Sequence, residues 1–169
     1  SQGSHCHGAN RNQTRDCNKN QAHQLQAGAV IMSQQFVKAI YARLTADTGG
    51  STNPLRTLVS DRIYGFEAPA QTELPLVLFS LDDAQTERFF DGKVKSVARF
   101  TVTCFGKSEA GANALLSIDT AAFDLLDQQE LAVTSHDRGI VQNLSRGAVI
   151  LQGEFFQIDS SYQIVGTST

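Results

Sequence analysis

Hydrophobic and polar positions in residues 33–50 repeat with the period of an α-helix. Apolar side chains recur at spacings of three and four residues, which places them on one helical face. Ser33 suits the N-cap, and the pair Gly49 and Gly50 suits the end of the helix. The members of the apolar stripe are Phe36, Val37, Ile40, Tyr41 and Leu44.

A second helical pattern runs from about residue 109 to residue 127. Glu109 falls in its predicted first turn, where a carboxylate interacts favourably with the positive end of the helix dipole. The apolar positions again follow one face, which predicts an amphipathic helix that covers a sheet. They are Leu115, Ile118, Ala122, Leu125 and Leu126.

Extended segments account for most of the remaining chain. Residues 94–105 alternate with period two, and their apolar parity holds Val94, Ala98, Phe100, Val102 and Cys104. Residues 76–81 are almost wholly apolar, as in a strand covered on both faces. Residues 82–92 are polar and charged and are predicted to form a hairpin loop. Shorter elements are predicted as a helical turn at 55–59 and strands at 62–65, 140–144, 148–151 and 154–164.

The order of these elements predicts the fold class. Helix, strands, helix and strands follow one another, and the short spacers between strands favour antiparallel pairing. We therefore expect an α+β domain, a mainly antiparallel sheet with two amphipathic helices packed on one face.

The first 31 residues differ in composition from the rest. Asn and Gln dominate them, and they hold two of the three cysteines and three of the four histidines. We interpret 1–31 as a flexible or extraneous N-terminal segment, with Met32 as the natural start and 32–169 as the single domain. A segment that orders on assembly is one alternative, and a metal site is another. That site would use Cys6, His7, Cys17 and His23, whose spacing lacks the close pair of structural zinc sites.

Charge and composition argue against several classes of protein. The chain has 169 residues and a formal net charge of −3. Residues 1–31 hold three basic and one acidic side chain, so the remainder carries −5. A dedicated nucleic-acid binder would show a basic stripe. There is neither a run long enough for a membrane helix nor the apolar core of a secretory signal, so we expect the protein in a cytoplasm.

Candidate catalytic chemistry is sparse, and we expect no enzyme activity and no cofactor. His136 beside Asp137 could form a general base, as in a small hydrolase, although neighbours in a turn are more often solvated. Cys104 falls on a buried strand parity and is predicted to be a core residue. Asp82, Asp83 and Glu87 lack the spacing of a calcium loop and are predicted to be a charged hairpin tip.

The pair Phe89 and Phe90 is unusual because it lies within a charged segment. One of the two is predicted to anchor a partner, since aromatic side chains are enriched at interface hot spots. The alternative is that one or both fold back onto their own domain. Nearby basic side chains could pair with acidic groups of a neighbouring subunit or face phosphates. The predicted interface residues are Asp82, Asp83, Glu87, Arg88, Phe89, Phe90, Lys93, Lys95 and Arg99.

The order of four motifs resembles the family of small phage tail-completion proteins, which includes tail terminators and tail-to-head joining proteins. The first motif is the helix at 36–47, and the second is Asp61-Arg62-Ile63-Tyr64 followed by Ala68-Pro69. The third is Leu74-Pro75, which leads into an apolar strand. The fourth is a long alternating strand that precedes an Ala-rich helix. The resemblance covers nearly everything after Met32. Leu76 departs from it, since an aromatic residue would be expected there.

The resemblance implies a structural virion protein of the tail or neck, assembled in the host cytoplasm. Such a subunit would form a homo-oligomeric ring, expected to be a hexamer, that caps the tail tube protein and docks to a neck or head-completion protein. DNA would pass through its lumen without specific binding. A neck or head-tail joining protein of the same shape is the alternative role, and direct DNA binding during packaging is another.

Overall fold

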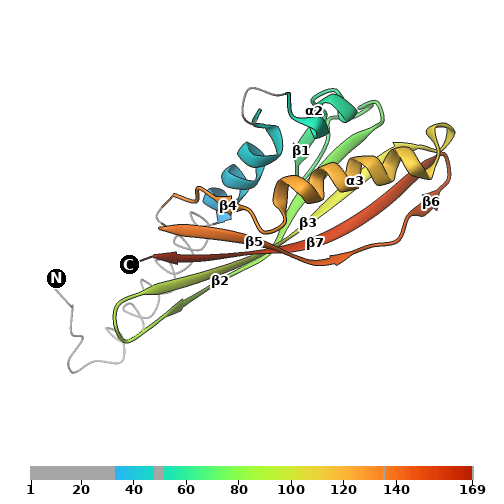
Figure 1. The fold of residues 1–169 in the computed structure, drawn as a ribbon. Helices are drawn as coiled ribbons and strands as arrows, with labels where there is room; N and C mark the ends of the chain where they lie inside the picture. The colour runs from blue at the N-terminus through green and yellow to red at the C-terminus, as the bar shows by residue number, and fades with distance from the viewer. Residues whose placement is uncertain (1–32, 48–51, 135, 169) are drawn as a thin grey trace, which may run out of the picture.

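A seven-stranded sheet is the centre of this fold (Figure 1). The computed structural model describes residues 33–47, 52–134 and 136–168. The first helix occupies residues 33–45. The following elements are α2 (Pro54–Val59), β1 (Ile63–Gly65), β2 (Leu76–Arg88), β3 (Val94–Lys107), a 3₁₀ turn (Ser108–Ala110), α3 (Ala112–Leu126), β4 (Glu130–Leu131), β5 (Arg138–Arg146), β6 (Ile150–Gln152) and β7 (Phe155–Ser168).

The strands lie in the order β1-β2-β3-β7-β5-β4, with β6 also paired to β7. The β1–β2 pair is parallel and the other pairs are antiparallel. The longest ladder joins β3 to β7, from Val94 opposite Ser168 to Lys107 opposite Phe155. This confirms a mainly antiparallel sheet in an α+β fold, although the parallel β1 and the short β4 were not expected.

One face of the central strands is buried. Along β3, Ala98, Phe100, Val102 and Cys104 are at most 1% exposed, as the alternation predicted. The ring of Phe100 stacks on Tyr162, its partner on β7, at 5.3 Å between centroids. Such cross-strand aromatic pairs strengthen a sheet beyond their area burial.

The helices contribute to the same core as this sheet face (Figure 1). Phe36, Ile40 and Leu44 of the first helix are fully buried, whereas Tyr41 is 47% exposed. The predicted apolar positions of α3 are all buried. Among the described residues there are three α-helices rather than two, because Pro54–Val59 is a helix in its own right.

Asn53 joins the first helix to α2. Its side-chain oxygen accepts from the Leu55 N–H, which caps α2, and its Nδ2 donates to the carbonyls of Leu44 and Ala46. One fully buried amide therefore satisfies backbone groups at two helix ends. Arg43 makes a second link, since its Nε donates to the Leu125 carbonyl at 2.7 Å.

A buried carboxylate joins α3 to the sheet. Asp119 is 1% exposed and accepts from the Ser160 hydroxyl of β7 at 2.8 Å. Arg146 of β5 donates to the other carboxylate oxygen through Nε at 2.9 Å and through Nη2. The Arg146 guanidinium also lies 4.9 Å from the Phe123 ring centroid. The hydrogen bonds that Arg146 donates to Asp119 raise the pKa of the guanidinium. This network fixes the helix against two strands.

Several predicted boundaries were wrong. Residues 82–88 continue strand β2 instead of forming a loop, because they pair with β3 up to Arg88 opposite Val94. Glu109 lies in the 3₁₀ turn and not in the first turn of α3, which begins after Gly111. Ser33 is already helical, so it is not a flanking cap in the described chain. Gly49, Gly50 and the segment 1–31 lie outside the described residues.

Asp119→Ala should lower the free energy of unfolding by about 2 kcal/mol, because it leaves the buried Ser160 hydroxyl without its acceptor. The Arg146 side chain is 38% exposed and can turn to water, so the larger loss expected for a fully buried ion pair is not reached. Urea unfolding measures the effect. The control is Asp124→Ala on the exposed side of the same helix, which should change stability by no more than about 0.5 kcal/mol. Equal losses of unfolding free energy in the two variants would contradict the role of Asp119 as the link between α3 and the sheet.

Candidate partner interface

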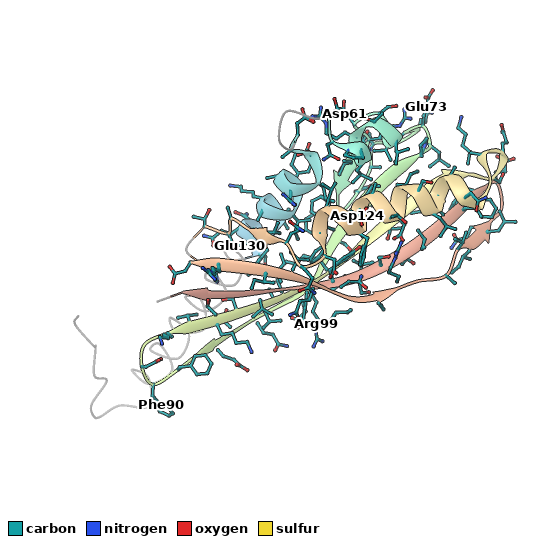
Figure 2. The ribbon with its side chains drawn as sticks, in the orientation of Figure 1. Asp61, Glu73, Phe90, Arg99, Asp124 and Glu130 are labelled. Carbon is teal, nitrogen blue, oxygen red and sulfur yellow. The ribbon has the colours of Figure 1, made fainter. Side chains whose placement is uncertain are left out.

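The predicted interface residues lie on the long hairpin of β2 and β3. Figure 2 shows Phe90 at the outer end of this hairpin and Arg99 on the side of the sheet away from Asp124 of α3. The hairpin therefore carries two surfaces. One is its tip, and the other is the sheet face that the helices leave uncovered.

A closed turn forms the tip. The Phe89 N–H donates to the Lys93 carbonyl at 2.9 Å, and the Gly92 N–H donates to the Phe89 carbonyl at 3.1 Å. The Asp91 carboxylate accepts from the Lys93 N–H at 3.1 Å. Gly92 has φ +84°, which residues with a Cβ rarely adopt. We call residues 89–93 the tip turn.

Both aromatic side chains of the tip turn are exposed. Phe90 has a relative exposure of 115% and Phe89 one of 50%. Of the two alternatives raised by the sequence, folding back into the core of the same subunit is therefore wrong for Phe90. Contact with a partner stays a prediction.

Charged side chains alternate in sign across the uncovered face. Asp83 is the register partner of Arg99, and Glu87 is the register partner of Lys95. Opposite charges in such positions stabilise a ladder by roughly 0.2–1 kcal/mol. The predicted charged hairpin tip is wrong for Asp82, Asp83 and Glu87, because they lie within β2.

Asp82 is also held locally, since it accepts from the Thr101 hydroxyl at 2.8 Å. Asp82 lies at the register shift between Leu81 and Asp83 in the pairing of β2 with β3. The acidic side chains that resembled a cation cluster are thus distributed along a strand. In the described part of the chain, no group of three or more His, Cys, Asp or Glu side chains is placed to hold a metal ion.

The His136 ring packs against other residues of the same subunit. Its ring lies 5.6 Å from the Phe36 ring, between centroids, and covers the bare backbone of Gly166, where a Cβ would approach Cδ2 to 2.7 Å. Nε2 is buried, and Nδ1 lies 3.4 Å from the Thr134 carbonyl. The Asp137 N–H donates to the Thr167 carbonyl at 2.8 Å. His136 and Asp137 line a hollow of about 510 Å³ together with residues 130–134.

Cys104 is fully buried on the inner face of β3. Burial raises the pKa of its thiol far above the usual range, so the nucleophilic thiolate does not form near neutral pH. Its environment matches the predicted core role.

The sequence patterns did not predict the network of Asp119, Arg146 and Ser160. A signal was available for one member. Asp119 falls four residues after Leu115, on the predicted buried face of the helix. A carboxylate on that face needs a partner. Arg146 carried no such signal, because its position depends on the β5–β7 register.

No protein-family model matches the chain, and no curated protein sequence matches it significantly. Solved structures do share the fold. A chain from the virion of a native gene transfer agent particle is 21% identical, with a TM-score of 0.61 over 84% of this chain and 97% of that one. A second solved protein, whose name describes no function, is 11% identical with a TM-score of 0.56, over 80% of this chain and 96% of its own.

No helix in the described ranges has the length and apolar character needed to cross a bilayer.

Replacing both Phe89 and Phe90 by Ala should leave the stability of the isolated subunit within about 0.5 kcal/mol of the original, because neither packs in the core. Thermal and urea unfolding measure this. The control is Phe100→Ala, which removes a buried ring and should cost about 3–5 kcal/mol. A loss of similar size at the tip would show that its aromatic rings stabilise the subunit itself.

Proposed function

We propose that this chain is a structural virion protein of a phage-like particle, and more specifically a tail terminator. Its ring would cap the tail tube and dock to the head-neck connector. The observation that carries the proposal is the fold shared with a gene transfer agent virion chain over 97% of that chain's length. The motif order that resembles tail-completion proteins supports the same role from the sequence alone.

The surface of the subunit suits assembly. A ring of identical subunits needs heterologous contacts whose rotation closes, so different surfaces of one subunit must meet. The tip turn and the uncovered sheet face are two distinct exposed surfaces on one hairpin. We propose a homo-hexamer with the tail tube protein on one side and a neck protein on the other.

The charge of the chain suits the passage of DNA. The formal net charge is −3, and an acidic lumen would let phosphates slide where a basic one would hold them. We therefore propose that DNA crosses the ring without specific binding.

We also propose that the chain is not an enzyme and uses no cofactor. The fully buried Cys104 supports this, because burial removes its thiol from solvent, and His136 packs against the Phe36 ring. Virion assembly in the host cytoplasm belongs to the same proposal.

A neck or head-tail joining protein is the second candidate, since the fold likeness does not distinguish the two positions. Negative-stain electron microscopy of particles assembled without this chain separates them. Full heads beside free tails of excessive, uncontrolled length are expected for a terminator, because nothing stops tube growth. Free tails of normal length beside full or leaking heads would place the chain at the neck. Normal infectious particles would contradict both structural roles.

A further inference from the structure

An apolar groove lies between α2 and α3, and nothing in the proposed function assigns it a role. Its volume is about 590 Å³. Leu58 of α2 and Leu116 of α3 line it and are 41% and 40% exposed. Ala121 and Leu125 contribute to the lining too. Apolar pockets of this kind receive the aromatic anchors of a partner.

The same subunit also has an exposed aromatic side chain, Phe90, that fills no pocket of its own. Phe90 is fully exposed, and the hydrogen bonds of the tip turn close the backbone on either side of it. Such preorganisation lowers the entropic cost of binding. In Figure 2, Phe90 and Asp124, which lines the groove, lie far apart, so a subunit cannot fill its own groove.

We propose that the tip turn of one copy enters the α2–α3 groove of the next copy. A surface patch that complements a pocket elsewhere on the same molecule makes a heterologous contact, which is the type that builds rings. The inference rests on the proposed function, because it presupposes the closed ring, and it names the contact between neighbouring subunits.

Opposite charges on the two surfaces are complementary. Asp124 is the charged side chain of the groove lining, and Lys93 is the cation of the tip turn. Lys93 lies 3.4 Å from Asp91 in a pair whose side chains are 63% and 54% exposed. Exposed pairs of this kind contribute little, so Lys93 can exchange its partner.

The area buried in this contact determines in which sample the contact can be detected. Two phenylalanine side chains bury roughly 300–500 Å² between them. A stable interface needs about 1,000 Å² or more, so the tip alone gives a weak contact that other surfaces of the assembly must support. The test therefore uses assembled particles rather than the dilute subunit.

The experiment introduces Asp91→Cys and Ser117→Cys into the full chain, with Cys6 and Cys17 replaced by Ser. These positions retain Phe89, Phe90 and both groove leucines, and Cys104 is buried and unreactive. Purified particles are treated with a short bis-maleimide and the chain is analysed on denaturing gels. The expected result is a ladder of covalent multimers. The control pairs Asp91→Cys with Glu154→Cys, an exposed position in the turn between β6 and β7, and should give no ladder.

Adding Leu116→Asp to the cysteine pair should reduce the ladder about tenfold, equivalent to about 1.4 kcal/mol of lost contact. If Ser117→Cys blocks entry into particles, Thr120→Cys replaces it on the same groove. Incorporated chain without a ladder, or a tip cross-linked to a different protein, would overturn this inference while leaving the virion role intact. Absence of the unmodified chain from particles would instead overturn the proposed function.

Discussion

The pairing of β3 with β7 is the constraint on which the rest of this structure depends. The two strands hydrogen-bond along fourteen residues each, from Val94 opposite Ser168 to Lys107 opposite Phe155. Because side chains alternate between faces, this one register sends Phe100, Tyr162 and Cys104 to the helices and Lys95 and Arg99 to the uncovered face. It also supports β2, and so determines where the hairpin presents its tip.

The helices are fixed to that sheet by a few polar contacts as well as by apolar packing. Asp119 connects α3 to β7 through Ser160 and to β5 through Arg146. Asn53 joins the first helix to α2 by satisfying backbone groups at both ends. Apolar packing alone is not strongly directional, whereas buried hydrogen bonds are costly to leave unmade. The groove between α2 and α3 therefore has a defined shape.

Much of the fold was predictable because its signals are local. The alternation of residues 94–105 and the helical stripe from Leu115 to Leu126 identified the buried faces. The extension of β2 through Asp82–Arg88 was not predictable in this way, since its polar composition is typical of a loop and only pairing with β3 makes it a strand. The partnership of Asp119 with Arg146 is likewise a product of register. For the candidate interface, the sequence singled out Phe89 and Phe90, but their exposure and the groove depend on tertiary structure.

The two faces and the exposed tip of the subunit suit the proposed ring at the end of a phage-like tail. The proposal requires first that the chain is part of the finished particle. Quantitative mass spectrometry of purified particles, with the head and tube proteins as internal standards, tests this most directly. The account predicts the chain at a small fixed copy number of six per particle. Its absence from purified particles, with normal amounts in the producing cells, would contradict the account.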